Sequence, residues 1–94
     1  MHETSICSAI QHRRLLSFLY GGSFRTVEPR ILGYDRDGEL TLRAWQQLGG
    51  GPQGWHDFQV SKMTSLAPAK GIFRGAAVAY YPGGETLARV LCRS

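Results

Sequence analysis

The chain lacks a long apolar run, a metal-binding cysteine pattern and a recognisable export signal. No stretch approaches the roughly 20 apolar residues that a membrane-spanning helix needs, so no membrane span is expected. The first residues contain no basic segment followed by an apolar one, which argues against a signal peptide. Cys7 and Cys92 stand alone without C-x-x-C spacing, and without an export signal we expect two reduced, mostly buried thiols. These absences predict a cytoplasmic protein with no metal or other cofactor.

The 94 residues suffice for one domain with a single modest core, so residues 1–94 are expected to fold as one unit. Eleven basic residues against seven acidic ones give a net charge of +4, and nine of the eleven are arginine. The planar guanidinium of arginine binds phosphate and stacks on bases, so this bias favours an anionic partner. The alternative is a basic surface that contacts only solvent, which accounts for the same net charge.

Two kinds of hydrophobic spacing divide the chain. Ile6, Ala9 and Ile10 recur at helical spacing, which predicts a short N-terminal helix. From Leu15 onward apolar residues alternate with others or form short runs, which predicts strands. Asp35-Arg36-Asp37-Gly38 is typical of a bulged hairpin turn. The expected strands are residues 15–20, 24–34, 40–45 and 55–63, with 64–68 continuing or ending the last.

Two segments leave more room for interpretation. The glycine-rich stretch 46–54 lacks the Lys-Ser/Thr pair and the following helix of a phosphate-binding loop, so it predicts a flexible hairpin loop. Residues 77–81 and 86–91 flank a Pro-Gly-Gly-Glu segment, which indicates a terminal hairpin. A C-terminal helix beginning at Glu85 is the alternative.

Several single residues and pairs are spread along the chain in a characteristic order: Ala9-Ile10, Arg13-Arg14, Tyr20, Arg25, Glu28-Pro29, Leu32, Gly38, Leu42, Ala44, Phe58 and Met63. This order resembles the WYL domain, a small bacterial regulatory module. The resemblance covers residues 5–73 and leaves 74–94 as a C-terminal extension. It implies a mainly β fold, an Sm-like small β-barrel of about five strands with an N-terminal α-helix.

Three positions depart from the family pattern. The Trp-Tyr-Leu triplet is here Leu40-Thr41-Leu42, an arginine before the phenylalanine is His56, and the Arg-Ile pair is Lys62-Met63. WYL domains usually follow a DNA-binding winged helix and sense nucleic acid or a nucleotide-like ligand for it. The 94 residues leave no room for such a DNA-binding domain, so the resemblance implies a stand-alone regulatory ligand-binding domain.

Cations interleaved with aromatic residues suit single-stranded nucleic acid or a nucleotide, because charge neutralises phosphate and flat rings stack on bases. Alternation along 40–45 places Arg43 and Trp45 on one side of their strand. The alternative is that Tyr20 and one tryptophan belong to the core while the arginines decorate the surface. The candidate binding residues are Tyr20, Arg25, Arg43, Trp45, His56 and Lys62.

A second hypothesis is a structural or protein-interaction module without a small ligand. Small barrels have open strand edges that self-association commonly covers, so a homo-oligomer, most simply a dimer, is expected. Trp45, Trp55, Tyr80 and Tyr81 would then contribute to the interface. No enzymatic activity is expected, because adjacent His56 and Asp57 point to opposite faces of a strand and cannot act as a catalytic pair.

Overall fold

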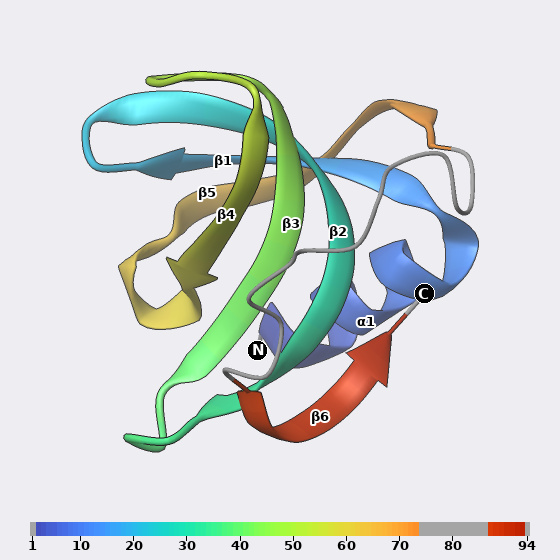
Figure 1. Ribbon diagram of the computed structural model, residues 1–94. Helices are drawn as coiled ribbons and strands as arrows, with labels where there is room; N and C mark the ends of the chain where they lie inside the picture. The colour runs from blue at the N-terminus through green and yellow to red at the C-terminus, as the bar shows by residue number, and fades with distance from the viewer. Residues whose placement is uncertain (1, 74–86, 94) are drawn as a thin grey trace.

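The structure, a computed structural model, describes residues 2–73 and 87–93, which form a helix and an antiparallel sheet (Figure 1). Five strands lie in the order β4-β3-β2-β1-β5, and β6 pairs with β2. This six-stranded sheet does not close, and β4 and β5 form its two ends. The expected mainly β architecture with an N-terminal helix is confirmed. In chain order the elements are α1 (His2–His12), β1 (Arg14–Tyr20), β2 (Ser23–Asp35), β3 (Leu40–Leu48), β4 (Gly54–Gln59), the 3-10 helix η1 (Val60–Lys62), β5 (Thr64–Ile72) and β6 (Leu87–Arg93).

Strand β2 organises the sheet because its two halves have different partners. Residues 23–27 pair with β1, whereas residues 31–35 pair with β6, and β3 runs along the other edge. The pairing with β3 shifts register between Pro29 and Ile31. Proline has no amide hydrogen to donate, so an irregularity at this position is expected. Close approach of β6 also needs Gly33, where an added Cβ would collide with the carbonyl of Arg89.

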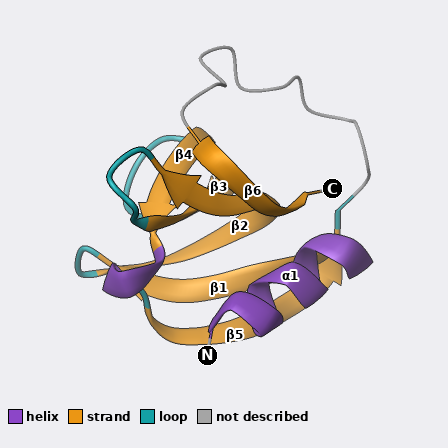
Figure 2. Ribbon diagram, turned by 90° about the horizontal axis from the view of Figure 1, so that it is seen from below, coloured by secondary structure: helices purple, strands orange, loops and turns teal. Residues whose placement is uncertain are grey.

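The core lies between α1 and the sheet. Ile6, Ala9 and Ile10 are buried, as their helical spacing predicts. Figure 2 shows α1 beside β1 and β5, with the rest of the sheet curling above it. Burying these apolar side chains against the sheet stabilises the fold by about 25 cal/mol per Å² removed from water. The sheet residues of the core are Leu16, Phe18, Val27, Leu32, Leu42, Ala44 and Phe58, with Val60 and Met63 beside them.

Local turn chemistry explains two chain reversals. Asp35 Oδ1 accepts hydrogen bonds from the amides of Asp37 and Glu39, both at 2.9 Å, and Gly38 has a positive φ of 80°. The turn predicted there is confirmed. The strand predicted over 55–63 is wrong at its end, because β4 stops at Gln59 and η1 follows. The amide of Met63 donates to the carbonyl of Val60 at 3.1 Å, which closes this single turn and directs the chain into β5.

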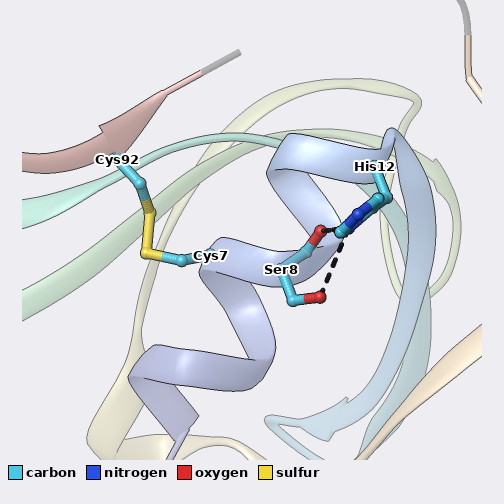
Figure 3. Close-up of a disulfide and its surroundings, with 4 residues drawn as sticks. All are labelled: Cys7, Ser8, His12 and Cys92. Atoms are coloured by element: carbon cyan, nitrogen blue, oxygen red, sulfur yellow. Dashed lines mark hydrogen bonds between the residues drawn. A yellow bond between two sulfur atoms is a disulfide. The ribbon is translucent and has the colours of Figure 1, made fainter.

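A disulfide joins Cys7 of α1 to Cys92 of β6 (Figure 3), with a Cα–Cα distance of 5.8 Å. The expectation of two reduced thiols is therefore wrong. The two residues lie 85 positions apart in the chain, and the sheet brings them together by pairing Cys92 with Leu32 of β2. The bond holds the C-terminal strand against the N-terminal helix.

The C-terminal strand settles part of the earlier ambiguity. Residues 87–93 form β6, so the alternative of a helix over 85–93 is wrong for these residues. The strand pairs with β2. Its predicted hairpin partner, residues 77–81, lies outside the described residues. Within 2–73 and 87–93, no helix has the length and apolar character needed to cross a membrane.

Candidate ligand-binding site

Five of the six predicted binding residues divide between the two faces of the sheet, and the sixth, Lys62, lies in η1. On β4, His56 lies opposite Ala44 of β3, whose side chain is in the core, and the next pair along is Arg43 with Asp57. Because side chains alternate along a strand, His56 shares the core-facing side, whereas Arg43 and Trp45 share the other. Tyr20 and Arg25 contact Phe58, which is also core-facing. The structure thus brings Tyr20, Arg25 and His56 together and separates Arg43 and Trp45 from them.

Phe58 is the common contact of this group. Its ring centroid lies 5.0 Å from that of Tyr20 and 5.8 Å from that of His56. The guanidinium carbon of Arg25 lies 5.6 Å from the centroid of Tyr20 and 5.9 Å from that of Phe58. Such cation–π contacts contribute about 0.5–2 kcal/mol each. We call the five residues Tyr20, Arg25, Gln46, His56 and Phe58 the Arg25 cluster.

The guanidinium of Arg25 is half-buried and held by neutral acceptors. Its Nη1 donates to Gln46 Oε1 at 3.1 Å, and its Nη2 donates to the carbonyl of Tyr20 at 3.2 Å. In the described part of the chain, no carboxylate lies within 4.0 Å of its nitrogen atoms. A half-buried positive charge without a counter-charge attracts anions, because little intervening water screens it.

Tyr20 is both a core and a site residue. Its ring packs edge-on against Phe18 at 6.1 Å and against Phe58, and its hydroxyl accepts a hydrogen bond from the amide of Gln59 at 3.0 Å. These contacts fix the ring across the end of β4. Tyr20 is half-buried and lies beneath the guanidinium of Arg25.

The glycine-rich loop between β3 and β4 lies over the Arg25 cluster. Gly49 has a positive φ of 148°, and an added Cβ there would lie 2.9 Å from Cδ of Arg25 and 3.2 Å from the carbonyl of Phe24. Gln46 Nε2 donates to the carbonyl of Pro52 at 3.4 Å, and His56 Nε2 lies 3.3 Å from the same oxygen. The glycines therefore permit close packing beside the cation, which the prediction of a flexible loop did not anticipate.

Lys62 is exposed at the end of η1. It follows Gln59, which binds the hydroxyl of Tyr20, by three residues. No ion pair within residues 2–73 and 87–93 involves its ammonium group. Lys62 therefore adds a solvated positive charge in the segment that adjoins the Arg25 cluster.

Arg43 does not form an exposed phosphate clamp. Its side chain is 2% exposed, and it donates from Nε to Asp57 Oδ1 at 2.9 Å and from Nη2 to Asp57 Oδ2 at 3.2 Å. This two-point geometry is the strongest form of an arginine–carboxylate pair. The charge of Arg43 is already balanced, so its role is to join β3 to β4.

Trp45 lies on the same face as Arg43 and packs against Trp55 rather than against the cations. The two indole rings are half-buried, with centroids 5.9 Å apart and an interplanar angle of 88°. Edge-to-face aromatic pairs across two strands stabilise a hairpin by about 0.5–1.5 kcal/mol. Arg43 and Trp45 are therefore removed from the candidate site.

The sequence contained a signal for these pairings. Arg43 and Asp57, like Trp45 and Trp55, are equidistant from Gly50 at the centre of the loop. A hairpin centred at Gly50 therefore pairs Arg43 with Asp57 and Trp45 with Trp55, as observed. Gln46 was missed because a glutamine in a strand carries no pattern of its own. Its role as an acceptor for Arg25 depends on the register between β2 and β3.

Two further observations limit the chemistry of the site. His56 and Asp57 point to opposite faces, since Asp57 binds Arg43 while His56 packs on Phe58. Among the described residues, no group of three or more histidine, cysteine, aspartate or glutamate side chains is placed to hold a metal ion. The arrangement suits electrostatic binding of an anion beside aromatic rings.

No protein-family model, curated protein or solved structure matches this chain. The resemblance to the WYL domain therefore stays a prediction that depends on the residues quoted for it.

Proposed function

We propose that the Arg25 cluster, together with Lys62, binds a phosphate-bearing ligand, single-stranded nucleic acid or a nucleotide. The observation that carries this proposal is the pairing of the three arginines of β2 and β3 with carboxylates. Arg30 and Arg43 are buried and each binds a carboxylate, whereas Arg25 is half-buried and has only neutral acceptors in the described part of the chain. A bound phosphate supplies the missing negative charge.

The aromatic surroundings of Arg25 favour a nucleotide over inorganic phosphate. The guanidinium lies over the ring of Tyr20, His56 contacts the same Phe58 ring as the guanidinium, and Tyr20 and His56 are both partly exposed. Stacking of a base on an aromatic side chain contributes about 1–3 kcal/mol and tolerates any base. Arg25 and Lys62 neutralise phosphate, and Tyr20 or His56 stacks on a base.

In this proposal the chain is a regulatory sensor of the WYL type. The strand order β4-β3-β2-β1-β5, the helix before β1 and the single 3-10 turn between β4 and β5 support an Sm-like barrel as its architecture. A cytoplasmic location stays a prediction, and the disulfide between Cys7 and Cys92 counts against it because disulfides are rare in the reducing cytosol.

The test is a titration of a fluorescein-labelled eight-nucleotide single strand, followed by anisotropy at 50 and 200 mM salt. Wild-type affinity should fall with salt, with a slope near −0.7 for each phosphate neutralised. Arg25→Gln should weaken binding about tenfold or more and reduce the slope. The matched control is Arg36→Gln, which removes an equal charge from the exposed turn after β2 and should change affinity less than about twofold.

Two additional arms separate the possible outcomes. Unlabelled mononucleotide as competitor distinguishes a single-nucleotide site from one that needs a strand. Circular dichroism of Arg25→Gln establishes whether lost binding reflects an altered fold. Wild-type protein that shows no salt-sensitive binding, or a folded Arg25→Gln variant that binds equally well, would refute the proposal.

The alternative function is a protein-interaction module that forms homo-oligomers. Its supporting observations are the open edges of β4 and β5 and the exposure of Ile72, 73% exposed, at the end of β5. Trp45 and Trp55 are half-buried against each other, and Tyr80 and Tyr81 lie outside the described residues. Sedimentation velocity at micromolar concentration tests this alternative, and a monomer over the whole range would exclude it.

A further inference from the structure

A groove separate from the Arg25 cluster lies between α1 and the strands β1 and β5, and its volume is about 630 Å³. This volume is within the range of roughly 300–1,000 Å³ that is usual for small-ligand sites. Figure 2 shows α1 running alongside β5, and side chains of both elements line the groove. None of its lining residues belongs to the Arg25 cluster. The lining residues are Thr4, Ser5, Ser8, Ala9 and His12 of α1, Arg14 and Leu16 of β1, and Leu66, Ala67 and Pro68 of β5.

Strand β5 is irregular on both sides of the stretch that borders the groove. Between the pairs Arg14 with Ile72 and Leu16 with Pro68, β1 advances two residues while β5 advances four, and between the pairs Ser17 with Ala67 and Leu19 with Thr64, β1 advances two while β5 advances three. The extra residues leave the ladder, so the strand bends on each side of Ala67 and Pro68. Ser8 and Ala9 of α1, which line the groove with this stretch, have small side chains.

The lining is sorted by chemistry. Leu16 and Ala9 are buried and Leu66 is half-buried, which gives the groove an aliphatic floor. One wall carries hydroxyl groups, and within residues 2–73 and 87–93 the imidazole of His12 is the single aromatic ring of the lining. A flexible alkyl chain would lie against the aliphatic floor. The hydroxyl groups belong to Thr4, Ser5 and Ser8.

Positive charge is concentrated at one end of the groove. Arg14 lines both this groove and a shallower neighbouring one of about 420 Å³, which also contains Lys70. Among the described residues, no carboxylate side chain lines either groove. Within residues 2–73 and 87–93, neither Arg14 nor Lys70 forms an ion pair. Both cations are exposed and available to an anionic group.

The backbone fixes Arg14 at this end. Arg13 has a positive φ of 55°, and its amide donates to the carbonyl of Ile10 at 3.3 Å as α1 ends. The carbonyl of Arg13 accepts a hydrogen bond from the amide of Phe73 at 2.8 Å. A left-handed conformation is unfavourable for arginine, so it persists only where neighbouring contacts enforce it. These contacts position the start of β1 at the mouth of the groove.

His12 lines the groove two residues before Arg14. Its Nδ1 donates to the carbonyl of Ser8 at 2.9 Å and lies 3.4 Å from Ser8 Oγ. Figure 3 shows Ser8 and His12 on a side of α1 away from Cys7 and its disulfide. Because Nδ1 is occupied by the helix carbonyl, Nε2 is the nitrogen left for a ligand.

We propose that this groove binds a small amphiphilic anion, an alkyl chain that ends in a carboxylate or phosphate. The chain lies along the aliphatic floor, and the head group binds the guanidinium of Arg14 through two parallel hydrogen bonds. Lys70 adds positive charge near the head group. From Thr4 to His12 the helix rises about 12 Å, which accommodates a medium-length chain.

The test is a titration of ¹⁵N-labelled protein with octanoate and, separately, with octyl phosphate, each below its micellar concentration. Amide shifts should concentrate in residues 4–16 and 66–72. Butyrate should bind at least about tenfold more weakly than octanoate, since each buried methylene contributes roughly fourfold in affinity. Neutral 1-octanol should also bind at least about tenfold more weakly. The two anionic titrations decide which head group is preferred.

Matched variants locate the site. Arg14→Gln should weaken octanoate binding about tenfold, while Arg36→Gln, an equal loss of charge elsewhere, should leave it within about twofold. Ser8→Leu should fill the groove and abolish binding. Its control is Gln11→Leu, an equally exposed position of the same helix that does not line the groove.

Three results would overturn the proposal. The first is the absence of amide shifts with octanoate and octyl phosphate at millimolar concentration. The second is an equal affinity for 1-octanol and octanoate. The third is unchanged octanoate binding in folded Arg14→Gln and Ser8→Leu variants.

Discussion

Removing the disulfide between Cys7 and Cys92 should cost this protein a large fraction of its stability. The bond closes a loop of 85 residues, nearly the whole chain. In the chain-entropy treatment, a cross-link of this span destabilises the unfolded state by about 4.5 kcal/mol. Domains of this size are stable by about 5–15 kcal/mol. At the lower limit, loss of the bond would leave about a third of the molecules unfolded at 25 °C.

The assay is urea unfolding of wild type and of the double variant Cys7→Ala with Cys92→Ala, followed by circular dichroism. With a denaturant slope of about 1.5 kcal/mol per molar, the midpoint should fall by about 3 M. The double variant is also the control for the effect of a reductant. Adding the reductant should lower the urea midpoint of the wild type and leave the midpoint of the double variant unchanged. Thiol titration of wild type unfolded without reductant should detect no free thiol.

Two results would contradict this reasoning. A midpoint shift below about 0.5 M would show that the cross-link does not constrain the unfolded chain as its span requires. Two free thiols in the unfolded, unreduced protein would show that Cys7 and Cys92 do not form the bond, which would restore the expectation drawn from the sequence.

Three further predictions concern the sheet and the Arg25 cluster. Asp57→Asn should lower the free energy of unfolding in urea by about 2–3 kcal/mol, because it leaves the buried charge of Arg43 with a weaker partner. A change below about 0.5 kcal/mol would show that the pair contributes little to stability. Gly49→Ala should lower the urea midpoint more than Gly54→Ala. Both glycines have φ near 148°, but only at Gly49 would an added Cβ have other atoms within 4 Å. Equal midpoints would show that the loop does not pack against Arg25 as described. His56→Ala should weaken oligonucleotide binding about fivefold or more, because it removes a partly exposed ring on which a base can stack. Unchanged affinity would exclude His56 from the site.

Local patterns predicted those parts of the fold that depend on neighbouring residues. The spacing of Ile6, Ala9 and Ile10 predicted α1 because a buried helix face repeats every three to four positions. The turn at 35–38 was predicted because aspartate accepts amide hydrogen bonds and glycine adopts positive φ. Neither feature needs knowledge of distant partners.

The misassigned features depend on partners far away in the chain. The alternation of residues around Arg43 is the same whether its side chain is exposed or buried. Its pairing with Asp57 across β3 and β4 shows that it is buried. Cys7 and Cys92 meet because β6 returns to pair with β2, a contact that no local spacing announces. The strand predicted over 55–63 continues its alternation through Val60, so the 3-10 turn at Val60–Lys62 left no trace in the pattern.

The two proposed sites stand at opposite ends of β1, and this geometry makes their independence testable. β1 begins at Arg14, in the groove, and ends at Tyr20, in the Arg25 cluster. At roughly 3.3 Å per residue the two positions lie about 20 Å apart. Sites separated by more than about 10 Å without shared partners usually act additively. Saturating octanoate should therefore leave the oligonucleotide dissociation constant within about twofold in the anisotropy titration. Direct competition would mean that the alkyl anion binds at Arg25, and the groove would then lose its assignment.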